Sequence, residues 1–328
     1  MKMNAAVLVA PGRIEVGHFD VPEPTPGGVL VRMRAASICG SDLHVIFDGF
    51  HRGNLGLPGY PGHEGVGEVV ASDSPEFSPG QPVLTVPAPS EGNRCFAEYL
   101  ALDARFVLPL PPDGDPTRLL LAQQLGTTIY AMRKFWPSGE GAACATVLGA
   151  GSAGLFFLQQ LRAAGFEKVI VSDLEPYRLR VARELGADLA VHAPRESVVE
   201  ATMDLTEGVG ADLVIEAAGY DACRAQCVEA VRERGRIGFY GYPERPGSAP
   251  FPIELAFRKA PTIEFTVGTQ REPALRSFRE ALRAIHEGRV EVGHCLEPRF
   301  PLARAPEAFA TARERRPGAV KVGIDLAS

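Results

Sequence analysis

Two short polar clusters in the first quarter of the chain carry residue types that bind metals and move protons. They are CGSDLH (residues 39–44) and GHE (residues 62–64). Cysteine, histidine and carboxylate are the usual protein ligands of a catalytic zinc ion, which keeps one coordination position open. Ser41 and His44 could carry to solvent the proton that a metal-bound alcohol loses, and Asp42 could orient His63. Taken alone, one cysteine and one histidine 24 positions apart are weak evidence for a metal.

A glycine-rich sequence in the middle of the chain indicates a second kind of site. GAGSAG (residues 149–154) follows an apolar strand-like run and precedes an apolar helical run, 155–164. Gly149 would allow a tight turn, Gly151 the close approach of a pyrophosphate, and Gly154 the packing of helix on strand. The start of the helix, with Ser152 and Ala153, would offer free N–H groups to the phosphates. This context favours a dinucleotide site over a glycine-rich turn that binds nothing.

An acidic residue lies at the distance that such a site requires. The apolar run 168–172 ends in Asp173, 19 residues beyond Gly154. A carboxylate at this position accepts a hydrogen bond from a ribose 2′-hydroxyl and repels a 2′-phosphate, so NAD(H) is favoured over NADP(H). Arg178 could approach the adenosine side of the cofactor, although a solvated position on a helix explains it at least as well.

The elements that must position these residues fall into two patterns. The first 120 residues show short strand-like runs separated by glycine and proline, which is typical of a small β-rich domain. After about Leu125, strand-like and helical runs alternate, which predicts a doubly wound parallel sheet. A helix at about 273–288 leads to a strand-like tail at 319–326. The sequence therefore predicts an α/β protein in which a β-rich domain is interrupted by an inserted α/β domain.

Composition excludes several classes of protein. The chain has 328 residues, 45% of them hydrophobic and 23% charged, which suits a globular protein of two domains. Its net charge of −6 disfavours a nucleic-acid binder. Six scattered cysteines and a short, interrupted apolar N-terminus predict a cytoplasmic protein and no disulfide framework. The uncharged stretch 141–161 divides into a strand-like and a helix-like half, so we predict no membrane span.

In its motifs, the chain resembles the medium-chain, zinc-type alcohol and polyol dehydrogenases. The resemblance rests on the sequences CGSDLH (39–44), GHEGVGEV (62–69), FAEY (96–99), VLGAGSAG (147–154), Asp173 and VKVGID (320–325), and it spans nearly the whole chain. It implies a GroES-like catalytic domain at 1–124 and 268–328, with a Rossmann NAD-binding domain inserted at 125–267. It also implies a homodimer or homotetramer.

The resemblance further implies roles for individual residues. Cys39 and His63 would be zinc ligands, and Glu64 a nearby or alternating ligand. Ser41 and His44 would form the proton relay, and Phe96 would line the substrate pocket. Lys321 would supply the basic group that the family places near the cofactor pyrophosphate.

Two departures from the family pattern affect the expected metals. The segment that should carry a four-cysteine structural zinc site retains a single cysteine, Cys95, so we expect no structural zinc. The third catalytic ligand of the family aligns with Gln123, whose neutral amide is a poor zinc ligand. Gln123 could ligate weakly, Glu64 or less readily Cys95 could replace it, or the metal could be lost.

These observations predict an NAD(H)-dependent oxidoreductase that interconverts a secondary alcohol or polyol and a ketone with the help of zinc. A zinc-free reductase of an enone, quinone or aldehyde is the alternative that Gln123 favours. A non-catalytic NAD(H)-binding protein is the third hypothesis. We expect no nucleic-acid or membrane partner, and the sequence does not identify the alcohol or ketone substrate.

Overall fold

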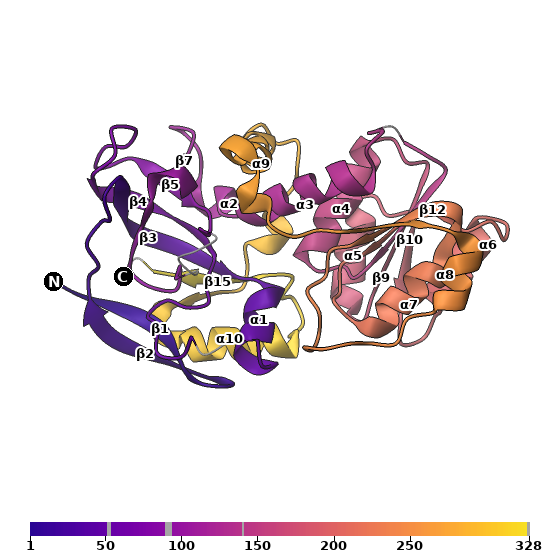
Figure 1. Cartoon of the computed structure of the whole chain (residues 1–328), viewed down its shortest axis with the longest axis horizontal. Helices are drawn as coiled ribbons and strands as arrows, with labels where there is room; N and C mark the ends of the chain where they lie inside the picture. Colours follow the sequence, from indigo (N-terminus) through magenta and orange to yellow (C-terminus); the bar gives the residue numbers. More distant parts are fainter. Residues whose placement is uncertain (51–53, 89–93, 140, 327–328) are drawn as a thin grey trace. The chain divides into compact units, whose positions relative to one another are not determined.

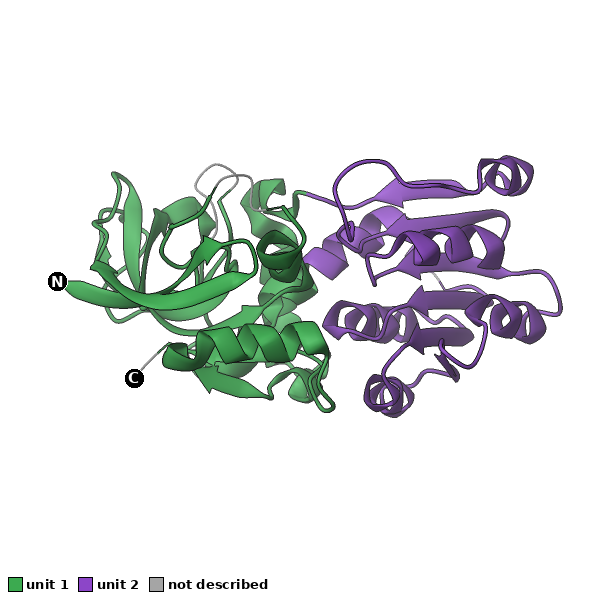
Figure 2. Ribbon diagram, turned by 90° about the horizontal axis from the view of Figure 1, so that it is seen from below, with its two compact units in different colours: residues 1–126, 268–328 green, residues 127–267 purple. Residues whose placement is uncertain are grey.

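The computed structural model describes residues 1–50, 54–88, 94–139 and 141–326, which form two compact units. Unit 1 comprises residues 1–126 and 268–328, and unit 2 comprises residues 127–267 (Figure 2). The chain passes from the first unit to the second within helix α3 (Ala122–Phe135). His51, which follows the first polar cluster in the sequence and which could border the substrate, lies outside the described residues.

Unit 1 is built on antiparallel strands. β1 and β2 form a hairpin, and a second sheet has the strand order β14-β15-β3-β4-β5-β7, with β6 also paired to β3 (Figure 1). Its long central strand, β3, pairs with β4 and β15 as well as with β6. The strands are β1 (Lys2–Ala10), β2 (Arg13–Asp20), β3 (Gly28–Ile38), β4 (Glu64–Ser72), β5 (Pro82–Thr85), β6 (Tyr99–Asp103), β7 (Val107–Pro109), β14 (Arg299–Pro301) and β15 (Val322–Asp325).

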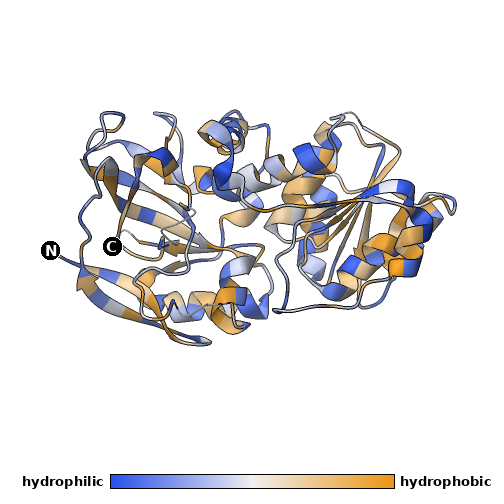
Figure 3. Ribbon diagram, in the orientation of Figure 1, coloured by the Kyte–Doolittle hydropathy of each residue, from blue (hydrophilic) through white to orange (hydrophobic). Residues whose placement is uncertain are grey.

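Unit 2 is a six-stranded sheet in which all neighbouring strands are parallel, in the order β10-β9-β8-β11-β12-β13. Its central strands are continuous apolar runs, as expected when helices cover both faces of a parallel sheet (Figure 3). The strand order reverses between β8 and β11, where open α/β sheets bind ligands. The strands are β8 (Cys144–Leu148), β9 (Lys168–Asp173), β10 (Leu189–His192), β11 (Ala211–Glu216), β12 (Val231–Phe239) and β13 (Thr262–Phe265).

Helices connect the strands of unit 2 and flank the sheets of unit 1. In the described part of the chain, none is long and apolar enough to cross a membrane, and the uncharged stretch 141–161 contributes to β8 and α4. The helices other than α3 are α1 (Gly40–Phe47), α2 (Pro116–Leu119), α4 (Ser152–Ala163), α5 (Pro176–Glu184), α6 (Val198–Leu205), α7 (Asp221–Ala230), α8 (Ile253–Lys259), α9 (Arg276–His286) and α10 (Ala305–Glu314).

The predicted fold class is confirmed, and the predicted and observed structures differ only in the boundaries or detection of single elements. The sequence predicts a helix that continues to Glu233, but β12 begins at Val231, directly after α7. It also predicts a strand at 96–100, whereas β6 begins at Tyr99 and Phe96 joins the apolar core of unit 1. β13, α8 and α10 were not predicted. β13 and α8 have no fully buried residue, so their hydrophobic periodicity is weak, whereas α10 does carry a helical spacing of buried residues at Ala305, Ala308 and Phe309.

Candidate active site

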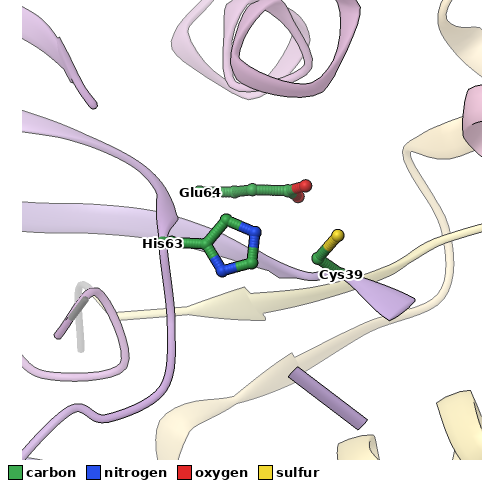
Figure 4. Close-up of side chains that lie close together, drawn as sticks. All are labelled: Cys39, His63 and Glu64. Atoms are coloured by element: carbon green, nitrogen blue, oxygen red, sulfur yellow. The ribbon is translucent and has the colours of Figure 1, made fainter. Parts of the chain in front are cut away.

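The two polar clusters of the sequence meet at the end of β3. β3 and β4 are antiparallel, and their register sets Ser37 opposite Glu64. Cys39 therefore follows the end of β3 at the point where His63 enters β4. Figure 4 shows the side chains of Cys39, His63 and Glu64 pointing toward one another. One ligand atom from each of the three lies within 4.8 Å of the others.

Asp42 holds His63 in a defined orientation. Its Oδ1 atom lies 2.8 Å from Nδ1 of His63, and its Oδ2 atom accepts the backbone N–H of Cys39 at 2.9 Å. Because a carboxylate only accepts hydrogen bonds, Nδ1 carries a hydrogen, and Nε2 is the nitrogen that can bind a cation when the ring is neutral. Burial disfavours a charged imidazole, but Asp42 and Cys39 outweigh burial and raise the pKa of His63 well above its ordinary value.

Glu64 is buried and has one oxygen engaged and one free. Its Oε2 atom lies 2.7 Å from Nζ of Lys321 and accepts the hydroxyl of Ser37. Its Oε1 atom is buried and has no hydrogen-bond partner among the described residues. Burial alone would raise the pKa of Glu64, but the ammonium of Lys321 outweighs burial and lowers it. Glu64 is therefore a carboxylate at neutral pH, with one oxygen available to a cation.

This donor set fits a zinc ion. Cysteine sulfur, imidazole nitrogen and carboxylate oxygen are the ligand types that catalytic zinc takes, with a fourth position left for substrate. A buried polar atom without a partner needs an explanation, and a cation beside Oε1 of Glu64 would supply one. The cluster can therefore hold a metal that polarises a substrate oxygen.

Gln123 and Cys95 are the two other residues that the sequence proposes for the metal. Gln123 is buried at the start of α3, and its amide carries no charge for a cation. Cys95 contacts the hydroxyl of Thr85 at 3.5 Å and lies outside the group of three. Burial raises the pKa of its thiol to about 11, so Cys95 stays protonated at neutral pH and is a poor ligand.

The residues predicted for the proton relay and the substrate pocket lie outside the group of three possible metal ligands. Ser41 and His44 lie three residues apart on α1 and so share one face of that helix. Phe96 has no exposed surface and packs edge-on against Phe309, with ring centroids 5.1 Å apart. Phe96 thus belongs to the apolar core of unit 1, and its place on the wall of a substrate pocket stays a prediction. The sequence did not indicate that Ser37 and Lys321 hold Glu64, because Lys321 is distant in the chain and Ser37 belongs to no motif.

The glycine-rich sequence forms the turn from β8 into α4. Gly149 has a φ of +104°, a backbone conformation that residues other than glycine rarely adopt. A Cβ atom on Gly154 would lie 1.8 Å from the carbonyl oxygen of Gly149. Helix α4 begins at Ser152, directly after its N-cap residue Gly151. The N–H groups at the start of α4, including those of Ser152 and Ala153, thus lie at the carboxyl end of β8, where phosphates bind.

Asp173 and Arg178 lie beside this turn. Oδ2 of Asp173 accepts the N–H of Ala150 at 2.7 Å, and Oδ1 accepts the N–H of Glu175 at 2.9 Å. Nη1 of Arg178 lies 3.9 Å from Oδ2 of Asp173 and 4.0 Å from the position of a Cβ on Gly151. Unit 2 therefore brings the glycine turn, the acid and the arginine together. Lys321, which the sequence assigns to the same cofactor, belongs to unit 1 and is bound to Glu64.

One buried acid of unit 2 was not singled out from the sequence. Glu216 ends β11, beside the point where the strand order reverses, and its Oε1 atom accepts the N–H groups of Ala218 and Gly219. Ala218 in turn lies against Gly149. Burial raises the pKa of Glu216, although these N–H groups and Arg224 oppose the shift. A single acid at the end of an apolar strand was the available signal.

Comparisons with known proteins agree with both units. A family model described as "Alcohol dehydrogenase GroES-like domain" matches residues 25–112, and one described as "Zinc-binding dehydrogenase" matches residues 153–287. The L-threonine 3-dehydrogenase of Bacillus subtilis (strain 168) is 29% identical over 92% of this chain and 93% of its own length. That of Pyrococcus horikoshii is 30% identical over 74% of this chain and 77% of its own length. The solved structure of the alcohol dehydrogenase TADH from Thermus sp. ATN1 is 25% identical, with a TM-score of 0.84 and coverage of 98% and 99%.

An added methyl group should have different effects at two of the three glycines of the turn, Gly151 and Gly154. Gly154→Ala forces a Cβ into the backbone of Gly149 and should lower the free energy of unfolding by about 3 kcal/mol. Gly151→Ala meets no atom closer than 4.0 Å, so stability should change by less than about 0.5 kcal/mol while NADH affinity falls about 10-fold. Urea unfolding and NADH fluorescence titration measure the two effects. Equal losses of stability in both variants would contradict this account of the turn.

Proposed function

Because this chain belongs to the zinc-type medium-chain alcohol dehydrogenase family, we propose that it interconverts a secondary alcohol or polyol and a ketone, with zinc and NAD(H). Its enzyme class, an oxidoreductase acting on small-molecule alcohols, follows from the family. The cofactor, the metal and the kind of alcohol are the parts that we propose.

The convergence of Cys39, His63 and Glu64 carries the proposal. These three residues supply one thiolate, one imidazole nitrogen and one carboxylate oxygen within 4.8 Å of one another, and the oxygen is buried without a partner among the described residues. Bound there, zinc would polarise the oxygen of the substrate and lower the pKa of its hydroxyl group.

The residues around this cluster prepare it for that chemistry. Asp42 fixes the hydrogen of His63 on Nδ1, so that Nε2 faces the cation. Ser37 and Lys321 hold Oε2 of Glu64, so that Oε1 is the oxygen presented to it. In our proposal, Ser41 accepts the proton of the alcohol and His44 passes it toward solvent.

NAD(H) is the cofactor that the charges of unit 2 favour. Asp173 places a carboxylate beside the glycine turn, and that carboxylate would accept a ribose hydroxyl and repel a 2′-phosphate. Arg178 lies on the open side of Gly151, where we propose that it meets the pyrophosphate. Lys321 stays a predicted cofactor ligand, although its ammonium is engaged with Glu64.

L-threonine is the first substrate to test. Both relatives named above are called L-threonine 3-dehydrogenases, and L-threonine carries a secondary hydroxyl group on C3. Simple diols and polyols extend the same test to other secondary alcohols.

The alternative, a zinc-free reductase of an enone, quinone or aldehyde, is favoured by Gln123, whose neutral side chain stands where a charged ligand is expected.

Removing either strong ligand should separate metal binding from cofactor binding. We expect about one zinc per chain in the wild type, consistent with no structural zinc, and close to none in Cys39→Ser or His63→Ala. Oxidation of L-threonine or a diol should fall by at least about 100-fold, whereas NADH affinity should be unchanged because the glycine turn and Asp173 lie in unit 2, away from the substituted residues in the sequence. Elemental analysis, NAD⁺ reduction at 340 nm and NADH titration give the three readings.

Cys95→Ser is the matched control, because Cys95 is a buried thiol outside the cluster of ligands. It should keep both zinc and turnover. Full turnover without zinc would favour the zinc-free reductase, and NADH binding with no turnover on alcohols or ketones would favour a non-catalytic binder. Either result would overturn the proposal.

Asp173 should set the preference between the two nicotinamide cofactors. Asp173→Asn keeps the shape of the side chain but removes the charge that repels a 2′-phosphate, so the ratio of NADH to NADPH affinity should fall about 10-fold. Glu175→Gln removes a charge two positions away and should leave the ratio unchanged. Fluorescence titration with NADH and NADPH measures it, and an unchanged ratio in Asp173→Asn would refute this role.

We also propose that two copies of the chain associate through one edge of unit 2. β13 is an edge strand, and large apolar side chains occur on it, directly after it and on α8. These side chains are Ile253, Phe257, Phe265 and Val267, which are 69%, 85%, 66% and 82% exposed. Unpaired backbone groups on an edge strand beside exposed apolar side chains favour association with a second chain.

Light scattering on a sizing column tests this surface. The wild type should have at least twice the 35.1 kDa mass of one chain, and Phe257→Glu with Phe265→Glu should have the mass of one chain. Val209→Glu changes another exposed apolar residue of unit 2 and should not alter the mass. A double variant that keeps the wild-type mass would rule out this edge as the interface.

Finally, we propose a cytoplasmic location for the protein. All six cysteines are free in the structure, which suits a compartment that keeps thiols reduced.

A further inference from the structure

We propose that Asp48 is a positioning residue for His44, which fixes the hydrogen of the imidazole on Nδ1 and leaves Nε2 to act as a base. The inference deepens the proposed function, since it rests on the role of His44 in moving the proton of the alcohol. Asp48 belongs to none of the motifs in which the chain resembles its family.

The contact between the two side chains is built into the end of helix α1. Nδ1 of His44 lies 2.8 Å from Oδ2 of Asp48, one helical turn later. Asp48 is the C-cap residue of α1, and its N–H donates to the carbonyl of His44 at 3.0 Å. The same two residues are thus joined through backbone and through side chain, which restricts where the carboxylate can lie.

Phe50 restricts His44 from a second direction. Its N–H lies 3.4 Å from the carbonyl oxygen of His44, and its ring meets the imidazole edge-on, with centroids 6.3 Å apart and planes at 71°. Phe47, next to Asp48, is covered by the guanidinium of Arg313 from α10 at 4.1 Å from the ring centroid. The turn that follows α1 is therefore fixed on both sides of Asp48.

The chemistry of the pair assigns the hydrogen. An ionised carboxylate has no hydrogen to donate, so the nitrogen that contacts it must be the N–H of the ring. Nε2 then holds the lone pair, which is the form of histidine that can take a proton from a hydroxyl. Ser41 lies three residues before His44 on the same face of α1, so the order carboxylate, imidazole, hydroxyl runs along one helix.

The solvent exposure of the Asp48 side chain sets how far turnover should fall when Asp48 is changed. In a buried triad of the serine-protease type, changing the orienting aspartate to asparagine lowers turnover by about 10⁴-fold, because the wrong tautomer forms. The side chain of Asp48 is 35% exposed, so water can replace part of its contact. We therefore expect Asp48→Asn to lower turnover by about 10-fold, well below the effect of a buried orienting residue.

The chain contains a matched control in the same unit. His286 and Asp113 form another histidine–aspartate pair, with Nε2 and Oδ1 3.6 Å apart and the aspartate 83% exposed. Asp113→Asn removes the same charge from a looser surface pair that is remote in the sequence from α1. It should not change the tautomer of His44 or the rate of alcohol oxidation.

Long-range ¹H–¹⁵N NMR of the histidine rings in the full chain tests the inference without any need for turnover. Histidine is labelled with ¹⁵N, His44→Gln identifies the resonances of His44, and all spectra are recorded at the same alkaline pH. The wild type should show hydrogen on Nδ1 of His44. Asp48→Asn should populate the form with hydrogen on Nε2, and Asp113→Asn should match the wild type.

A wild-type ring with hydrogen on Nε2, or an Asp48→Asn ring that keeps hydrogen on Nδ1, would overturn the inference. Oxidation of L-threonine by the same variants tests the proposed function separately. If His44→Gln keeps the full rate while Asp48→Asn changes the tautomer, the positioning stands and the proton relay fails. If His44→Gln loses turnover and Asp48→Asn keeps both rate and tautomer, the relay stands and the positioning fails.

Discussion

The antiparallel register that sets Ser37 opposite Glu64 is the constraint on which the rest of unit 1 depends. It places Cys39, at the exit from β3, beside His63, at the entry to β4. Side chains alternate between the two faces of a strand, so a slip of one residue would turn Glu64 away from the cluster. The same strand, β3, also pairs with β15, which begins directly after Lys321 and so brings its ammonium to Glu64.

The cluster is a set of buried charges that compensate one another. Lys321 and Ser37 engage one oxygen of Glu64, and Asp42 engages one nitrogen of His63, so each pair leaves a single atom for a cation. Removing one member of such a pair leaves an uncompensated buried charge, which costs more than the pair contributes. The contacts that stabilise unit 1 here are thus the same contacts that select which atoms face a metal.

The parts of the protein that local sequence determines could be predicted, and the parts that depend on distant pairing could not. The glycine turn and Asp173 follow from residues within one strand–helix–strand unit, β8–α4–β9, and the fold class follows from the change in hydrophobic period after Leu125. The contact of Lys321 with Glu64 joins residues in two strands that meet through β3. The place of Phe96 depends on its packing against Phe309, which no motif encodes.

Unit 2 carries the residues proposed for the dinucleotide and unit 1 the donor cluster, so the account as a whole depends on whether that cluster binds a metal as assigned. X-ray absorption at the zinc edge of the metal-loaded protein measures this most directly. We predict one sulfur at about 2.3 Å, from Cys39, and nitrogen or oxygen neighbours at about 2.0–2.2 Å. A spectrum with no sulfur neighbour, or with several, would contradict the assignment of Cys39, His63 and Glu64 as the ligands.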